Sequence, residues 1–299
     1  MSSSKVVEGE GGQQKVVLQH ASGATAEVYL WGATLTSYKA PSGKESIFVS
    51  PAAIFDGKKA IRGGVPLVFP QFGQPDKAMP QHGIARINMW ELGACTDTGD
   101  AMTATFTLQD NEDTRAKWPH AFQLEYVVEL TEQALTMRLR ITNSGDEPFA
   151  FHALLHTYFA VPDIADVLVE GLKGRSFEDK VAGGEPQEEA REQVDVPSYT
   201  DRIYLASEPG AKEVSILSKG TALYKSVNSA TPNLGGRAHE DASSPCDVVL
   251  WNPFPEASPG DLPPPAFRGF VCVEPGLVGK FQDLAPKAAM ELCQTIVPL

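Results

Sequence analysis

The stretch that decides the fold is LTMRLRIT, residues 135–142, because its apolar and polar side chains alternate strictly. Leu135, Met137, Leu139 and Ile141 would share one face, and the threonines and arginines the other. A period of two is typical of a strand with one face in the core. A second β-like run, LEYVVEL at residues 124–130, precedes it after a short connection. We therefore predict two consecutive strands here.

The segment that follows this pair contains two histidines. Residues 143–148, NSGDEP, are rich in turn formers, and Pro148 disfavours a helical start just before it. The apolar run FHALLHTYF, residues 151–159, comes next. We predict a strand over residues 149–160. Its shared face would then carry His152, Leu154, His156 and Tyr158.

The spacing of His152 and His156 means different chemistry on a helix and on a strand. On a helix, residues four apart lie one above the other and could bind one metal ion. On a strand they are about 13 Å apart, which excludes a shared ion. We therefore predict no metal site, and one histidine acting singly as a proton donor or acceptor. A hydrogen-bonded core residue is the alternative interpretation for either histidine.

Similar β-like runs recur along the whole chain of 299 residues, and 26 glycines and 23 prolines supply the turns between them. These runs are residues 16–18, 26–30, 104–108, 167–169, 214–217, 247–251 and 270–273. Residues 253–265 are rich in proline and are predicted to form a loop. We predict an all-β protein. It would be a large antiparallel β-sandwich of one domain, residues 15–299, after a flexible N-terminus, residues 1–14.

The charge distribution restricts the partners. A net charge of −13 argues against nucleic acid, which requires a basic face. Residues 57–90 nevertheless carry five basic side chains against one acidic, a local charge of +4 that could attract a small anion. Residues 178–195 carry seven acidic and two basic side chains, −5, and we interpret them as a solvated loop.

Cysteine usage and hydropathy indicate the cellular compartment. The four cysteines lie far apart without a C-x-x-C pair, which argues against a zinc ribbon or a redox motif. The first residues lack an apolar signal region, and no apolar run reaches membrane-spanning length. We expect a cytoplasmic monomer without a membrane partner.

Two glycine-containing segments carry groups suited to a polar ligand. In RGGVPLVFPQFG, residues 62–73, the glycines beside Arg62 would let the backbone approach a ligand closely. In QHGIAR, residues 81–86, Gln81, His82 and Arg86 surround another glycine. Such groups can together bind sugar hydroxyls and a phosphate. Alternatively, both arginines are surface residues in ordinary ion pairs.

Two carboxylates are further candidates. Glu274 ends the apolar run VCV, residues 271–273, directly before a Pro-Gly pair, where it could serve as a base or simply stabilise the turn. Asp201, in TDRIYL, is equally ambiguous.

Six ordered motifs together resemble one family. RGGVPLVFPQFG, QHGIAR, FHALLHTYF, TDRIYL, VLWNPF and VCVEPG occur in the order and approximate spacing found in glucose-6-phosphate 1-epimerases of the galactose mutarotase-like superfamily. The resemblance covers roughly residues 15–296. It implies a large β-sandwich and interconversion of the α and β anomers of hexose 6-phosphates.

The resemblance also implies residue roles. His156 matches the catalytic acid and Glu274 the catalytic base, while Arg62, Gln81, Arg86 and Asp201 match substrate ligands. His82 matches a histidine near the sugar in related mutarotases. Opening a cyclic hemiacetal needs one proton removed from the C1 hydroxyl and one delivered to the ring oxygen, so an acid and a base suffice without metal or cofactor.

Three further functions are open. The protein could act on unphosphorylated aldoses, bind carbohydrate without turnover, or hydrolyse glycosides with Glu274 and a second carboxylate such as Asp201. In each case we expect His152 to support the edge of the site.

Overall fold

The computed structural model describes residues 2–206, 212–231 and 244–299. Within these ranges every strand-to-strand pairing is antiparallel, and the strands form three sheets. The four-stranded sheet has the order β1 (Ser3–Glu8), β2 (Gln14–Gln19), β3 (Thr25–Tyr29) and β4 (Thr34–Lys39).

The other two sheets are larger. The eight-stranded sheet has the order β14 (Pro186–Glu188), β13 (Ser176–Asp179), β16 (Thr200–Tyr204), β19 (Asp247–Asn252), β20 (Phe270–Leu284), β10 (Phe149–Leu155) and β5 (Leu67–Val68), and β11 (Tyr158–Ala160) also pairs with β20. The nine-stranded sheet has the order β15 (Gln193–Asp195), β12 (Val167–Glu170), β17 (Glu213–Ser218), β18 (Thr221–Thr231), β21 (Ala289–Pro298), β9 (Leu135–Asn143), β8 (Phe122–Thr131), β7 (Ala101–Gln109) and β6 (Glu91–Asp97).

Helical structure in the described ranges is short. It comprises α1 (Glu112–Lys117) and the 3-10 turns η1 (Glu10–Gly12), η2 (Ala85–Ile87), η3 (Ile164–Asp166) and η5 (Ala266–Gly269). None of these helices is long or apolar enough to cross a membrane.

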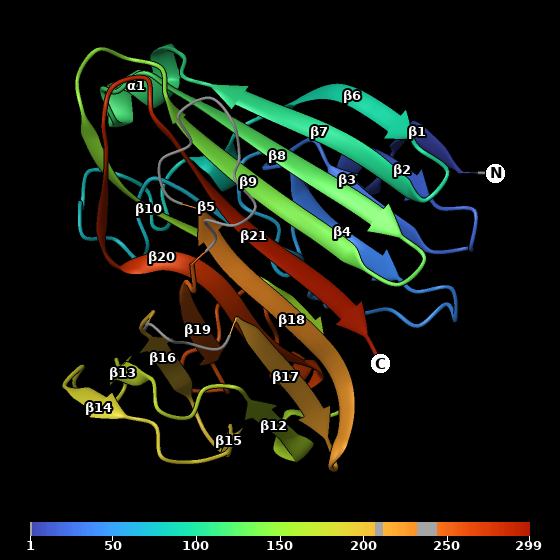
Figure 1. Cartoon of the computed structure of the whole chain (residues 1–299), viewed down its shortest axis with the longest axis vertical. Coiled ribbons are helices and arrows are strands. Elements are labelled where there is room, and N and C mark those ends of the chain that lie inside the picture. Colours follow the sequence, from blue (N-terminus) through green and yellow to red (C-terminus); the bar gives the residue numbers. More distant parts are fainter. Residues whose placement is uncertain (1, 207–211, 232–243) are drawn as a thin grey trace.

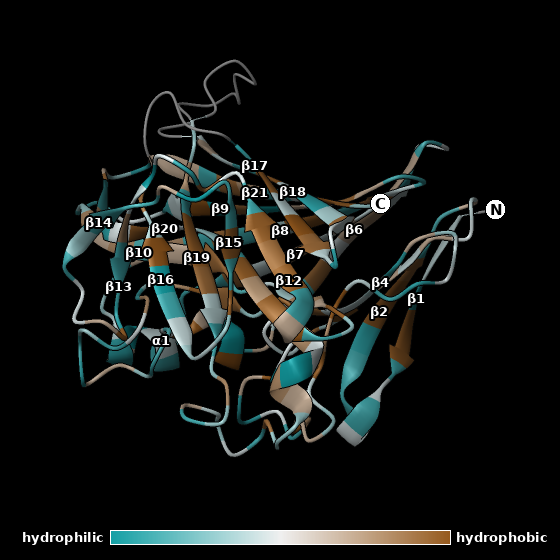
Figure 2. Cartoon of the chain, turned by 90° about the horizontal axis from the view of Figure 1, so that it is seen from below, coloured by the Kyte–Doolittle hydropathy of each residue, from teal (hydrophilic) through white to brown (hydrophobic). Residues whose placement is uncertain are grey.

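The nine-stranded sheet forms one layer, and the other two sheets form the second (Figure 1). One hydrophobic cluster fills the space between them and includes Val16 of β2, Tyr126 of β8 and Val271 of β20, each fully buried. Apolar residues gather along strands such as β12 and β19, whereas α1 is hydrophilic (Figure 2). The predicted antiparallel β-sandwich is confirmed.

The predicted strands form, with one interruption within residues 149–160, whereas two segments that were expected to be irregular contain strands. The run at 135–142 is β9, and its alternation is reproduced by burial at every second residue, as it is in β8. The expectation of a flexible N-terminus is wrong for Ser3–Glu8, which pair with β2 along their whole length. The acidic stretch 178–195 is not one solvated loop either, because it contributes to β13, β14 and β15.

The predicted strand over 149–160 is interrupted at His156 and Thr157, between β10 and β11. Both halves nevertheless pair with β20 in one register, Leu154 with Gly276 and Tyr158 with Cys272. In this register Pro275 lies opposite Leu155, the last residue of β10, and it has no N–H to donate to a ladder. The His156 amide instead donates to Pro66 O at 3.1 Å. The continuous register places His156 level with Glu274.

Candidate active site

The backbone of residues 62–73 is fixed beside the histidine strand. Leu67 and Val68 form β5 and pair with β10. At Gly63 and Gly64, with φ of 98° and 73°, an added Cβ would lie 2.5 Å from Phe48 O and 2.3 Å from Leu35 O. Only glycine tolerates both the backbone conformation and this close approach. The glycine pair therefore serves packing against the neighbouring strands, and it anchors Arg62 at the start of the loop.

The sheet register brings the catalytic candidates to one face. Asp201, Trp251, Cys272 and Tyr158 lie side by side across β16, β19, β20 and β11. Glu274 is two residues beyond Cys272 on the same strand, so it projects from the same face. Residues directly opposite one another on antiparallel strands have Cβ atoms about 5 Å apart. Four strands therefore supply a compact row of side chains.

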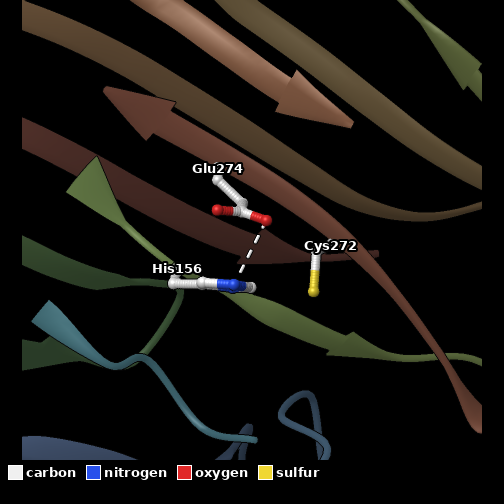
Figure 3. Close-up of side chains that lie close together, drawn as sticks. All are labelled: His156, Cys272 and Glu274. Carbon is white, nitrogen blue, oxygen red and sulfur yellow. Dashed lines mark ion pairs between the residues drawn. The ribbon is translucent and has the colours of Figure 1, made fainter. Parts of the chain in front are cut away.

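The two proposed proton-transfer groups are adjacent and buried. His156 Nδ1 lies 3.3 Å from Glu274 Oε1, and the side chains point toward each other (Figure 3). Their alignment does not make a hydrogen bond, and neither carboxylate oxygen has a hydrogen-bond partner among the described residues. Glu274 is 1% and His156 6% exposed. Stacking on Tyr158 at 4.8 Å fixes the plane of the imidazole ring.

Burial shifts the pKa values of this pair in opposite directions. Burial, and then the negative charge of Asp201, raise the pKa of Glu274 well above its ordinary value. Burial, and then the positive charges of Arg86 and Arg62, lower the pKa of His156 well below its ordinary value. Both shifts favour the uncharged forms. The fold alone therefore disfavours the carboxylate–imidazolium form of the pair.

A pocket of about 370 Å³ opens above this pair. Its volume falls in the range of about 300–1,000 Å³ that is usual for small-molecule sites. All seven predicted site residues line it, together with residues that the sequence did not single out. The full lining is Arg62, Phe72, Gly73, Gln81, His82, Arg86, His156, Lys180, Tyr199, Asp201, Val249, Trp251, Ala257, Pro259 and Glu274.

The pocket contains three cationic side chains, and each has a different interaction partner. Arg62 Nε donates to Asp261 Oδ1 at 2.8 Å, so this arginine lines the pocket and is ion-paired at the same time. Arg86 donates to Gln81 O at 2.9 Å and has no ion pair among the described residues, and burial lowers its pKa to about 10. Lys180 Nζ lies 4.2 Å from the Phe72 ring centroid. Arg86 and Lys180 thus keep charge available for an anion.

The remaining predicted ligands are polar and mostly uncharged. His82 Nδ1 accepts a hydrogen bond from Gly73 N at 3.2 Å, and its ring meets His156 edge-on at 5.8 Å. Burial, followed by the charge of Arg86, lowers the pKa of His82 well below its ordinary value. Burial raises the pKa of Asp201. These groups can exchange hydrogen bonds with sugar hydroxyls.

His152 lies outside the pocket lining. Its Nδ1 accepts a hydrogen bond from Phe72 N at 3.2 Å, and its ring stacks on Phe281 at 3.8 Å. Burial lowers the pKa of His152 to about 4. It therefore contacts the edge of the site through the backbone of Phe72.

Three useful residues were not predicted from the sequence. Lys180 lies in the acidic stretch that was interpreted as a loop, and its amide donates to Asp201 O at 2.9 Å. Trp251 lies in a motif that gave no role to any single residue. Cys272 is two residues before Glu274, so strand periodicity alone would have placed it on the same face. The proline-rich segment is a loop as predicted, and it provides Ala257, Pro259 and Asp261 to the site.

Fold and site together define a β-sandwich with a buried histidine–glutamate pair at a small polar pocket. The aldose 1-epimerase family model matches residues 14–292. The chain belongs to the aldose 1-epimerase family.

Individual proteins with similar sequences or structures carry names of the same kind. A protein of Cenchrus ciliaris named "Putative glucose-6-phosphate 1-epimerase" is 32% identical over 94% of this chain and 84% of its own length. One of Escherichia coli strain K12 with the same name is 32% identical over 94% of this chain and 89% of its own length. The crystal structure of a "putative mutarotase" from Salmonella typhimurium superposes with a TM-score of 0.81 at 30% identity, covering 98% of this chain and 96% of that one.

Proposed function

We propose that this protein interconverts the α and β anomers of D-glucose 6-phosphate and related hexose 6-phosphates. The single observation that carries the proposal is the position of the buried pair His156 and Glu274 in one pocket with Arg86 and Lys180, two cations without an ion pair among the described residues. The acid–base pair suits hemiacetal opening, and the cations suit a phosphate. The names of the relatives support the same substrate class.

The proposed reaction conserves protons over a cycle. Glu274 as carboxylate removes the proton of the C1 hydroxyl, the C1–O5 bond breaks, and protonated His156 gives its proton to O5. The open aldehyde then rotates about C1–C2. The two groups exchange roles on closure, which exposes the other carbonyl face and restores both protons. The modest barrier of the solution reaction means that this pair can account for the chemistry.

The proposed reaction requires a Glu274 carboxylate beside a His156 imidazolium. Arg62 and Arg86 oppose this because their charges lower the pKa of His156. A phosphate dianion bound to the cations would offset those charges and favour the imidazolium. We therefore infer that the phosphate of the substrate contributes to proton transfer as well as to binding.

Anomer exchange followed by NMR, on glucose 6-phosphate and on glucose, tests the proposal. Arg86→Ala should weaken binding of the phosphorylated sugar by about 10–150-fold, which is the contribution of one charged hydrogen bond. Binding of the free sugar should be weakened far less. Arg62→Ala should discriminate less, because Asp261 already neutralises Arg62. Equal losses on both sugars would return Arg86 to a structural role. Saturable binding without faster exchange would instead identify a carbohydrate-binding protein.

Two different activities would give different products in the same experiments. A mutarotase for unphosphorylated aldoses would turn over glucose as well as its phosphate, and a glycosidase would release sugar from a glycoside. We also propose a reducing compartment such as the cytosol, because all four cysteines are free. The monomeric state is likewise a proposal, which sedimentation would test.

A further inference from the structure

The acid–base pair has a third neighbour of different chemistry, the thiol of Cys272. Three donor atoms, one each from His156, Cys272 and Glu274, lie within 4.8 Å of one another (Figure 3). Cys272 is fully buried, and no disulfide involves it. The proposed reaction needs an acid and a base but no thiol. An imidazole, a thiolate and a carboxylate are, however, the three side-chain ligands that Zn²⁺ prefers.

The spacing of the donors fits a tetrahedral ion. Bonds of about 2.0–2.1 Å to nitrogen and oxygen at a tetrahedral angle separate the two ligand atoms by about 3.3 Å. His156 Nδ1 and Glu274 Oε1 are 3.3 Å apart without a hydrogen bond between them. A Zn–S bond of about 2.3 Å would require the sulfur to lie about 3.5 Å from the other donors. Since the donors lie within 4.8 Å of one another, Cys272 needs to approach by at most about 1.3 Å.

The donors are also unoccupied by competing partners. His156 Nδ1 and both oxygens of Glu274 are buried and have no hydrogen bond among the described residues. Buried polar atoms without partners are rare in proteins and point to an ion, a water or a ligand. His156 and Glu274 line the pocket, whereas Cys272 is fully buried and is not part of its lining. An ion could therefore enter from the pocket and keep its fourth position open toward it.

We propose that His156, Glu274 and Cys272 form an inhibitory Zn²⁺ site that overlaps the sugar site. Zinc bound there takes the lone pairs with which Glu274 and His156 would exchange protons, so the metal and the sugar phosphate exclude each other. Zinc binding itself does not depend on the proposed function, whereas inhibition does.

Metal binding is measured first, with Co²⁺ as a visible substitute for Zn²⁺ on the whole purified chain in a phosphine reductant. We expect a thiolate-to-cobalt absorption band in the near ultraviolet that Zn²⁺ abolishes. Cys272→Ser should remove the band. It should also weaken Zn²⁺ binding by at least 10–100-fold, because replacing a residue that only supports a metal ligand already costs about that much affinity. Cys246→Ser is the matched control, because Cys246 is also a buried free thiol but lies outside the cluster.

Inhibition is measured next, relative to each variant's own activity without metal. Zn²⁺ should raise the KM of wild-type protein for glucose 6-phosphate with little change in kcat. Glu274→Gln, which keeps the shape of the side chain, should also weaken Co²⁺ binding and so provides a test even if Cys272→Ser does not fold. No cobalt band in wild-type protein, or a band and a zinc affinity unchanged in Cys272→Ser, would overturn the site. Cobalt binding at Cys272 without inhibition would retain the metal site and refute the overlap.

Discussion

Replacing Glu274 with glutamine should lower activity and raise stability at the same time. Glutamine keeps the size of the side chain but cannot accept the C1 proton. Losing one positioned base costs about 10²–10⁴ in turnover, or about 3–5 kcal/mol of transition-state stabilisation. Because Glu274 is only 1% exposed, bulk water has little access to replace it, and we expect the upper half of this range.

The stability effect follows from the uncompensated burial of the carboxyl group. A folded pKa above the ordinary 4.5 means that the folded state binds more protons than the unfolded state as pH rises above 4.5. Stability of the wild type therefore falls with rising pH in this window, by up to about 1.4 kcal/mol per pH unit from this one group. Glu274→Gln abolishes the titration. Its advantage over the wild type should be small near pH 4.5 and grow toward pH 7.

Glu189 is a matched control, because its carboxylate is also buried, at 3% exposure, but accepts hydrogen bonds from Arg191 and Tyr204. Burial opposes its ionisation, yet hydrogen bonds from Arg191 and Tyr204 hold the pKa of Glu189 below its ordinary value. Glu189→Gln should therefore destabilise the protein near neutrality.

Urea unfolding of the wild type and both variants at pH 5 and pH 7, together with NMR anomer exchange, measures these effects. A folded Glu274→Gln with near wild-type exchange would remove Glu274 from the mechanism. A variant less stable than the wild type at pH 7 would refute the inference that this carboxylate lacks native partners.

Three further predictions concern the cations and the histidines. Lys180→Ala should raise the KM for glucose 6-phosphate by about 10–150-fold and leave the KM for glucose nearly unchanged. Lys77→Ala, a control at an exposed position, should change neither KM. Added phosphite should accelerate exchange of free glucose in the wild type but not in Arg86→Ala; no acceleration would show that the phosphate acts through binding alone. His156→Ala should lose about 10²–10⁴ in turnover, while His152→Ala should stay within severalfold of the wild type because His152 lies outside the pocket, and equal losses would contradict the separation of the two histidines.

Local patterns in the sequence determined the class of fold. The alternation in residues 135–142 is a property of neighbouring residues along one chain, and burial at every second position of β9 follows directly from it. The same periodicity predicted β10 but could not reveal that pairing stops at His156, because the reason lies on another strand. Pro275, which lies opposite Leu155 at the edge of the gap, is brought there only by the alignment of β20 with β10 and β11.

Motifs in the sequence likewise singled out His156, Glu274 and five further residues that line the same pocket, but not how these side chains are arranged. The distance between the pair, the neutralisation of Arg62 by Asp261, and the place of Lys180 and Cys272 all depend on residues far apart in the chain. So do the pKa shifts, because burial and neighbouring charge are properties of the folded molecule. Sequence by itself determined which chemical groups are present and which segments become strands. Tertiary structure alone decided which of those groups meet, because side-chain contacts across a sheet are set by strand register rather than by distance along the chain.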